Sequence, residues 1–409
     1  MKYFYFILFI LPAYLFGYNI HIGSDFKLKE IKKGIELIND YDTLWIHSGK
    51  YSEGNISIHK SITLIGVDFP VLDGEFKYEI FSIYANNVSI EGFNIINSGY
   101  ASLDDPCGIK IYNGSNVTIK NNILENNFFG IYLQYCKHCL IVDNQIKTNR
   151  TEEQQNGNGI HCWKSDSLQI IHNEISGHRD GIYFEFVTHS VIWRNISTEN
   201  KRYGLHFMFS NDDAYITNLF KNNGAGVAVM YTKNVGMFNN TFEENWGDAA
   251  YGLLFKEISD SYLIGNKFKN NTTGVLMEGT SRIKIEHNSF VSNGWALKIS
   301  ASCMDNSFSH NNFISNTFDA ATNGTLVLNT FNENHWDKYE GYDLNKDGIG
   351  DTPFHPLSLF AVVVEKMPSA MLLYRSFMIT LLDKSERLLP SITPDNFIDA
   401  APKMKSYLL

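Results

Sequence analysis

The sequence has few residues that break or link domains. Only 9 of its 409 residues are proline, and no long proline- or serine-rich segment separates one part from another. Length alone allows two or three domains, but nothing marks a sharp boundary before about residue 340. An array of stacked repeats explains how so long a chain can lack a domain boundary, because one core can then lengthen in a single direction.

Basic residues and long apolar runs are also scarce. The chain carries 34 Lys and Arg against 44 Asp and Glu, a net charge of −10, without a basic stripe. This balance argues against a nucleic-acid partner.

After the first residues, no segment reaches the ~18 apolar residues that a transmembrane helix requires. Residues 1–17 combine one Lys, a short apolar run and a final Gly, which is typical of a secretory signal peptide; an uncleaved anchor is the alternative.

The middle of the chain contains a repeat. A Gly followed by Ile, Leu or Val recurs with steps of 22, 29, 22, 23, 22, 26 and 22 residues, and an Asn recurs in register with it. Because no single unit can bury its apolar row alone, we predict an all-β fold, a right-handed parallel β-helix of ~22-residue coils with a stacked Asn ladder. The glycines are Gly108, Gly130, Gly159, Gly181, Gly204, Gly226, Gly252 and Gly274, and the asparagines are Asn122, Asn144, Asn173, Asn195, Asn218, Asn240, Asn266 and Asn288.

Strand alternation assigns side chains to the inside or the outside of the solenoid. Cys162 falls in the inward row, and the repeat register places Cys136 and Cys139 where other coils hold small or apolar residues. We interpret these cysteines as core residues. The alternative is a metal or redox site around His138. Since the chain has 5 Cys, an odd number, at least one thiol stays unpaired.

The outward positions of the strand after each Gly are more aromatic and apolar than a solvent-exposed sheet needs. A contiguous patch of this kind indicates a surface for a partner or a ligand. We assign the partner surface on the β-helix to Tyr132, His161, Trp163 and Tyr183.

One outward column contains two thioethers. With coils ~4.8 Å apart, Glu185, Met208 and Met230 should stack, with His206 beside Met208. Thioether sulfur and imidazole suit Cu(I), so these four residues are our candidate for a transient copper site. The alternative is that both methionines are adaptable contacts in a protein interface.

The C-terminal region begins with the pattern DxNxDGxxD. It offers side-chain oxygens at alternate positions and a backbone carbonyl, as loops that hold a structural calcium ion do. Phe354 stands where such a loop has its bidentate Glu, so a hydrogen-bonded turn without an ion is the alternative. The candidate ligands are Asp343, Asn345, Asp347, Ile349 and Asp351.

An amphipathic helix of roughly five turns is predicted to start at Pro368, with Leu373, Phe377 and Leu381 on one face. It either covers the open end of the β-helix, or docks on a membrane partner through Met371, Phe377 and Met378, or lies on the bilayer surface. At the other end, Ile31, Ile35 and Ile38 fall at helical spacing and predict a start cap. We therefore divide the chain into a signal peptide (1–17), a cap with β-helix (18–342) and a loop with docking helices (343–409).

Several segments resemble the NosD family of periplasmic maturation proteins of nitrous-oxide reductase. Their outward residues match the family, beyond the bare repeat. The resemblance implies a periplasmic right-handed β-helix, peripheral to the membrane, that works with an ABC permease and its ATPase. It also implies that Cu(I) is taken from a lipoprotein copper chaperone and passed to apo nitrous-oxide reductase for assembly of its copper–sulfide cluster. The matching segments are 177–188, 202–210, 222–231, 251–261, 272–279, 293–299, 343–351 and 370–383.

Two other functions stay open at this point. Many β-helices are lyases, hydrolases or epimerases of carbohydrates, and these enzymes need clustered acids in an external groove. We expect residues 178–180 and 211–213 at one corner, one coil apart, where they could form such a cluster. The remaining alternative is a binding solenoid without metal. On balance we expect an accessory protein and no enzyme.

Overall fold

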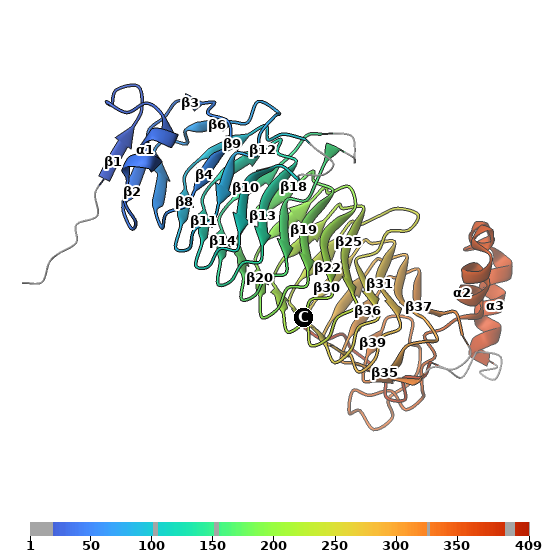
Figure 1. Cartoon of the computed structure of the whole chain (residues 1–409). Helices are drawn as coiled ribbons and strands as arrows, with labels where there is room; N and C mark the ends of the chain where they lie inside the picture. Colours follow the sequence, from blue (N-terminus) through green and yellow to red (C-terminus); the bar gives the residue numbers. More distant parts are fainter. Residues whose placement is uncertain (1–18, 101–104, 151–154, 325–327, 389–396, 409) are drawn as a thin grey trace, which may run out of the picture.

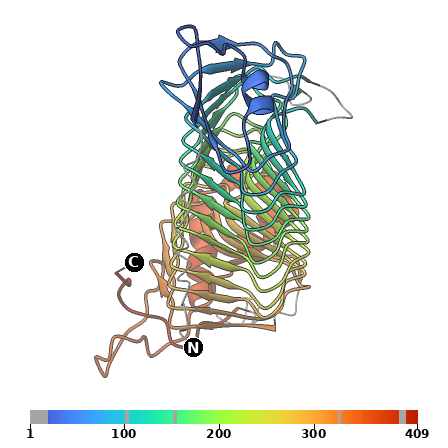
Figure 2. The same cartoon turned by 60° about the vertical axis from the view of Figure 1, so that its left-hand side comes forward.

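The computed structural model describes residues 19–100, 105–150, 155–324, 328–388 and 397–408. It confirms the predicted fold, a right-handed parallel β-solenoid of about 13 coils. Figures 1 and 2 show a three-sided column that runs from the N-terminal cap to a pair of helices. The predicted signal peptide, residues 1–17, lies outside the described residues.

Three parallel sheets form the sides of the column, and successive strands of the chain visit them in turn. Sheet A consists of β1 (Asn19–Ile22), β2 (Thr43–Ile46), β5 (Thr63–Gly66), β8 (Ser89–Glu91), β11 (Thr118–Lys120), β14 (Leu140–Val142), β17 (Gln169–Ile171), β20 (Val191–Trp193), β23 (Ala214–Ile216), β26 (Gly236–Phe238), β29 (Tyr262–Ile264), β32 (Lys284–Glu286), β35 (Met304–Ser309) and β38 (Leu328–Asn332). Sheet B consists of β3 (Lys50–Tyr51), β6 (Val71–Asp73), β9 (Asn94–Ile96), β12 (Ile123–Glu125), β15 (Gln145–Lys147), β18 (Glu174–Ser176), β21 (Ile196–Thr198), β24 (Leu219–Lys221), β27 (Thr241–Glu243), β30 (Lys267–Lys269), β33 (Ser289–Val291), β36 (Asn312–Ile314) and β39 (His335–Trp336). Sheet C consists of β4 (Ile56–Ile58), β7 (Phe81–Ile83), β10 (Cys107–Tyr112), β13 (Phe129–Gln134), β16 (Ile160–Trp163), β19 (Asp180–Glu185), β22 (Tyr203–Met208), β25 (Ala225–Met230), β28 (Leu253–Lys256), β31 (Thr273–Glu278), β34 (Trp295–Ile299) and β37 (Phe318–Thr322).

The interior of the column is one continuous apolar core. Inward side chains of neighbouring coils lie directly on one another, as with the rings of Phe242 and Phe268, whose centroids are 4.6 Å apart. All five cysteines are buried and unpaired. The placement of Cys136, Cys139 and Cys162 in the core is therefore confirmed.

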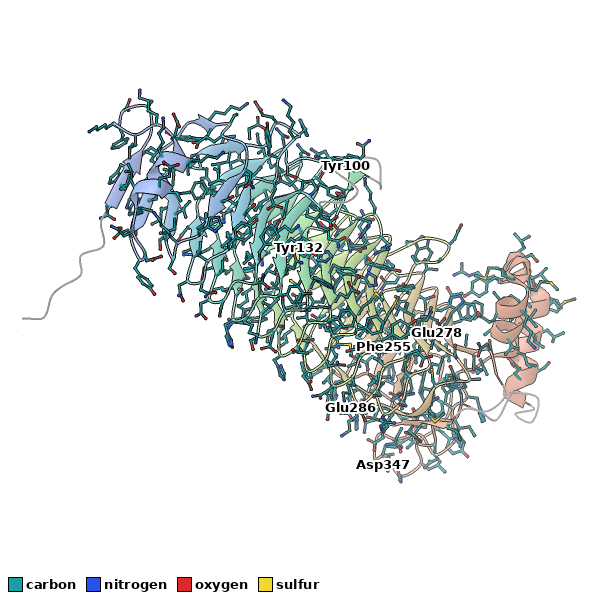
Figure 3. The ribbon with its side chains drawn as sticks, viewed as in Figure 1. Tyr100, Tyr132, Phe255, Glu278, Glu286 and Asp347 are labelled. Atoms are coloured by element: carbon teal, nitrogen blue, oxygen red, sulfur yellow. The ribbon has the colours of Figure 1, made fainter. Side chains whose placement is uncertain are left out.

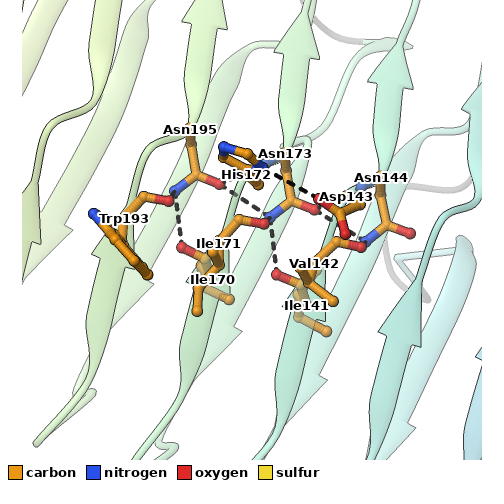
Figure 4. A network of polar contacts seen from close by, with 10 residues as sticks. All are labelled: Ile141, Val142, Asp143, Asn144, Ile170, Ile171, His172, Asn173, Trp193 and Asn195. Carbon is orange, nitrogen blue, oxygen red and sulfur yellow. Dashed lines mark hydrogen bonds and ion pairs between the residues drawn. The ribbon is translucent and has the colours of Figure 1, made fainter.

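Buried asparagines satisfy the polar groups where sheet A turns toward sheet B, as predicted. The Asn173 side-chain amide donates to Asn195 Oδ1 at 3.0 Å and to the Ile141 carbonyl at 2.9 Å (Figure 4). A second ladder, which the sequence reading missed, lines the corner between sheets B and C. Its members are Asn200, Asn223, Asn245, Asn271, Asn293 and Asn316.

Each end of the column is closed differently. Helix α1 (Ile31–Leu37) covers the first coil with buried Ile31 and Ile35, which confirms the predicted cap. At the other end, the Asp399 carboxylate accepts hydrogen bonds from the Asn334 side chain and from Trp336 Nε1, each at 3.0 Å. Residues near the C-terminus thus end the ladder and close the core.

The single five-turn helix predicted from Pro368 is wrong. The structure has α2 (Leu359–Lys366), a 3-10 helix η2 (Pro368–Leu373) and α3 (Phe377–Leu388). Arg375 adopts a left-handed φ of 64°, and the Ser376 hydroxyl and carbonyl accept the first N–H groups of α3, so a new helix begins there. Among the helices that the structure describes, none combines the length and apolar character needed to cross a bilayer.

Helices α2 and α3 pack on the side of the last coils, so they do not cover the open end of the core. Phe360 and Ile379 form a small apolar cluster with Phe318 on the outer face of β37. Lys298 and Glu365 add an ion pair of 2.8 Å between sheet C and α2. The pair of helices is therefore fixed to sheet C at its C-terminal end (Figure 1).

Asp213 is a buried acid inside the corner between sheets C and A. Its Oδ1 accepts the Ser190 N–H, while Oδ2 has no partner. Burial raises the pKa of Asp213 to about 8. Because the folded state then holds this proton more tightly than the unfolded state, stability must decline as the pH rises from about 4 to about 8.

We predict that Asp213→Asn removes this decline, because a neutral amide keeps the acceptor and cannot ionise. Urea unfolding at pH 5 and pH 8 would measure it: the parent should lose stability at pH 8 and the variant should lose less. Asp212→Asn, on the neighbouring exposed residue, is the control and should behave as the parent. Equal pH dependence in Asp213→Asn and the parent would contradict the prediction.

Candidate functional site

The outer face of sheet C carries two columns of side chains, one residue per coil. Strand register joins Glu185 to Met208 and Met208 to Met230, and it places His206 between Tyr183 and Ala228 in the neighbouring column. Figure 3 labels Tyr132 and Glu278, one member of each column. The first column is Lys110, Tyr132, His161, Tyr183, His206, Ala228, Leu254, Leu276 and Lys298; the second is Tyr112, Gln134, Trp163, Glu185, Met208, Met230, Lys256 and Glu278.

The expectation that both columns face solvent is wrong for the first column. Tyr132 and His206 are buried, and His161 and Tyr183 are only partly exposed. Ring stacking is the cause, since the ring centroids of Tyr132 and His161 lie 4.4 Å apart, and those of His161 and Tyr183 lie 4.7 Å apart. Burial also lowers the pKa of His161 to about 3, which keeps that ring neutral.

The second column, which we call the methionine column, is in polar contact with the first column. The Tyr183 hydroxyl lies 3.3 Å from Glu185 Oε2 and 3.9 Å from Met208 Sδ. Burial, followed by the charge of Glu185, raises the pKa of Tyr183 to about 12, so the hydroxyl stays a donor. His206 Nε2 is buried and has no hydrogen-bond partner, which leaves one ring nitrogen free at this point of the face.

An ion pair that the sequence reading missed supports His206. Asp180 is fully buried and receives Arg202 Nε at 2.9 Å and Nη2 at 2.5 Å. His206 Nδ1 lies 3.1 Å from Arg202 Nη2 and 3.6 Å from Asp180 Oδ2. Burial alone would raise the pKa of Asp180, but the neighbouring His206 ring and the hydrogen bonds and charge of Arg202 hold it below its ordinary value. The sequence signal that could have revealed this pair is an Asp directly before the repeat Gly of one coil and an Arg near the repeat Gly of the next coil.

The acid cluster expected at one corner is also wrong. Asp180 pairs with Tyr203 at the start of sheet C, whereas Asn211 pairs with Thr188 beyond its end. Asp180 and Glu185 stand at opposite ends of β19, five residues and ~16 Å apart in an extended strand. Glycosidase carboxylates lie only ~5–9.5 Å apart. These two acids therefore do not form such a pair.

The DxNxDGxxD loop forms a hydrogen-bonded turn near the C-terminal end of the column (Figure 3, Asp347). Its side-chain oxygens accept N–H groups of the loop itself: Asp343 Oδ2 accepts the Gly348 N–H at 2.9 Å, and Asp347 Oδ1 accepts the Ile349 N–H at 2.8 Å. Calcium requires six to eight converging oxygens. Across the described residues, no three His, Cys, Asp or Glu side chains are placed to share a metal ion, and the Asp343 and Asp347 oxygens of the loop are engaged with its own N–H groups.

Comparison with known proteins places the chain. Residues 149–341 match the family model described as a periplasmic copper-binding protein, NosD, and residues 26–167 match a right-handed β-helix model. The matched segment, which is a little under half of the chain, supports membership of the NosD family. It is 27% identical over 151 residues to the probable ABC transporter binding protein NosD of Pseudomonas aeruginosa. That match covers 36% of this chain and about a third (35%) of the relative.

Solved structures share the fold of this chain. A complex of the alginate lyase AlyF-OU02 with G6 has a TM-score of 0.60 at 14% identity, and covers 78% of this chain and 85% of that one. The Dettilon tailspike protein has a TM-score of 0.55 at 11% identity, with coverage of 70% and 64%. PfbA, a surface adhesin of Streptococcus pneumoniae, has a TM-score of 0.51 at 13% identity, with coverage of 69% and 85%. At these identities only the fold is shared.

We predict that Arg202→Met destabilises the protein by about 3 kcal/mol, because it leaves the Asp180 carboxylate buried without its cation. Chemical unfolding would measure this loss. The control is Arg282→Met, since Arg282 binds Asp260 with the same two-pronged geometry at an exposed site, where such pairs contribute about 1 kcal/mol or less. Adding Asp180→Asn to Arg202→Met should recover part of the loss. Equal losses in the two arginine variants would contradict the prediction.

Proposed function

We propose that this chain is an exported, periplasmic accessory protein that accepts Cu(I) on sheet C and passes it to apo nitrous-oxide reductase for assembly of the copper–sulfide cluster. The observation that carries the proposal is the register of Met208 and Met230 on adjacent coils, with His206 beside them. The description of the family as copper-binding supports it.

The donors on this face suit Cu(I). Side chains on adjacent coils lie ~4.8 Å apart, a gap that one ion can bridge between the Met208 and Met230 sulfurs. His206 adds a third soft-to-borderline donor if Nε2 is unprotonated. In the structure Arg202 Nη2 donates to His206 Nδ1 at 3.1 Å, so the neutral ring holds its proton on Nε2. His206 would therefore join the site only after the ring shifts so that Nδ1–H donates to Asp180 Oδ2, which is now 3.6 Å away. Glu185 closes the column on one side, and its charge favours a bound cation.

The C-terminal helices would hold this protein at its transporter. Exposed apolar side chains crowd η2 and α3, with Leu372 91%, Phe377 84% and Met378 70% exposed and Met371 beside them. Patches of this kind mark protein interfaces. The relative's name as an ABC transporter binding protein supports an ABC permease as the partner, with the ATPase behind it. The copper would arrive from a lipoprotein chaperone at the same membrane.

A carbohydrate enzyme is less well supported. A cleft of about 370 Å³ lies at the N-terminal end of sheet C, and Glu79 is the one carboxylate in its lining. That carboxylate already accepts hydrogen bonds from Ser82 and from the Tyr112 hydroxyl, which lies 3.1 Å from Oε1. Burial raises its pKa. One engaged acid does not supply the acid–base pair that glycoside hydrolysis requires.

We predict that replacing Met208 and Met230 by Leu weakens Cu(I) binding by roughly tenfold or more. The substitution keeps side-chain volume, so stability should change by less than about 1.5 kcal/mol. Competition with a Cu(I) chelator under reducing conditions would measure the affinity. Met304→Leu, at an exposed methionine on sheet A, is the matched control. Parent-like affinity in the double variant would exclude this column as the site.

We predict that Phe377→Ser with Met378→Ser abolishes co-purification with the ABC permease from detergent-solubilised membranes. Both side chains are largely exposed, so the melting temperature should stay within about 2 °C of the parent. Leu328→Ser, exposed on β38, controls for the loss of any exposed apolar side chain. Undiminished co-purification of the double variant would show that the helices are not the docking site.

A further inference from the structure

A ridge of exposed rings follows the edge of sheet C. Directly after the sheet, five successive coils place Tyr135, Lys164, Phe186, Phe209 and Tyr231 at one corner, which we call the aromatic ridge. Its four rings are between 37% and 44% exposed. The rings of Phe186 and Phe209 stack at 5.2 Å, those of Phe209 and Tyr231 stack at 5.0 Å, and the Lys164 ammonium lies 5.9 Å from the Phe186 ring. Exposed apolar rings thus run in a line over neighbouring coils.

The backbone of the ridge makes its composition unusual. All five residues have a left-handed φ between 47° and 56°, a conformation that bulky side chains disfavour. Many other corner residues repeat this φ, but between residues 107 and 332 the described ones outside the ridge are glycine, polar or charged, with no Phe, Tyr or Trp. Asparagine, which tolerates the conformation, is the commonest of them. Large rings therefore gather at one corner against the local preference.

Stacking does not offset the backbone strain of these rings. A left-handed φ costs about 1–2 kcal/mol per residue, hence about 3–6 kcal/mol for Phe186, Phe209 and Tyr231 together. Their two ring pairs return about 0.5–1.5 kcal/mol each, or about 1–3 kcal/mol. A purely structural role would be served better by Asn. Because polar residues form the same left-handed turn on other coils, the turn itself does not require these rings, and this points to a function for them.

The ridge adjoins the methionine column. Phe186 follows Glu185, Phe209 follows Met208 and Tyr231 follows Met230 in the chain. On the other side of the methionines lie His206 and Ala228, which are buried. A protein that brings its own ligand to an ion on Met208 and Met230 must therefore rest on the ridge, since that is the exposed side of the column.

We propose that the aromatic ridge is the docking surface for apo nitrous-oxide reductase when it takes Cu(I) from Met208 and Met230. The reductase would meet the ridge with an apolar surface, because exposed stacked rings turn their edges outward and pack favourably against aliphatic and thioether side chains. This inference rests on the proposed function of the column. It adds that docking and metal binding are carried by different residues.

The test is the triple variant Phe186→Asn, Phe209→Asn and Tyr231→Asn. Its stability should equal or exceed that of the parent, because Asn suits a left-handed φ. Cu(I) affinity and the rate of Cu(I) transfer to a small chelator should be unchanged. Transfer to apo nitrous-oxide reductase should slow by roughly tenfold or more. The control is Arg194→Asn, Thr217→Asn and His287→Asn, at left-handed positions of the corner between sheets A and B, which should transfer as the parent does.

Each outcome distinguishes a docking role of the aromatic ridge from the metal-binding role of the methionine column. Parent-like transfer to the reductase by the ridge variant would overturn the ridge proposal while Met208→Leu with Met230→Leu could still confirm the metal site. Loss of Cu(I) affinity or of stability in the ridge variant would also overturn it, because the rings would then be ligand supports or structural elements. Slow transfer to the reductase with unchanged chelator transfer is the supporting result.

Discussion

In-register pairing between successive coils places every other feature of this molecule. Each strand hydrogen-bonds to the strands one coil before and after it, so a side chain at one position meets its counterpart ~4.8 Å away. The same rule builds the stacked Phe242 and Phe268 rings inside, the Asn173 and Asn195 ladder at the corner, and the Met208 and Met230 column outside. One residue of slippage would turn the core outward and destroy all three, which makes the register strongly determined.

A ladder of this kind needs an end. Each Asn of the ladder between sheets A and B donates to the Asn of the next coil. The last one, Asn334, donates to the Phe308 carbonyl, but its second amide hydrogen would lack an acceptor in a dry environment, where an unpaired polar group is costly. Asp399 supplies that acceptor from a segment 65 residues later in the chain and also binds the Trp336 indole. The C-terminal segment is thus part of the β-helix in energetic terms, although the pattern of the sequence changes well before it.

Counting along the sequence was enough to predict what depends on periodicity alone. The glycine steps predicted the coils, the inward position of Cys162 and the neighbourhood of Glu185, Met208 and Met230. Features that depend on side-chain geometry could not be found this way. The Asp180–Arg202 pair joins residues on different coils whose types vary from coil to coil, and the burial of His206 arises from its neighbours' rings. The break between η2 and α3 comes from one left-handed residue, Arg375, inside an otherwise helical apolar pattern.

On the outer face of sheet C, the buried and the exposed side chains have different roles. Where coils place Tyr183 and His206 in contact, rings and the Asp180–Arg202 pair form a rigid, mostly buried layer that holds donor groups in place. At the corner beyond Met208 and Met230, the chain accepts strained backbone in order to keep large rings at the surface. A solenoid can tolerate this arrangement because its stability is a sum over many coils, so a few strained corner residues are held by the packed core beneath them. Rigid donors beside an exposed apolar ridge are what a surface needs if it is to hold a soft ion only until a partner protein arrives.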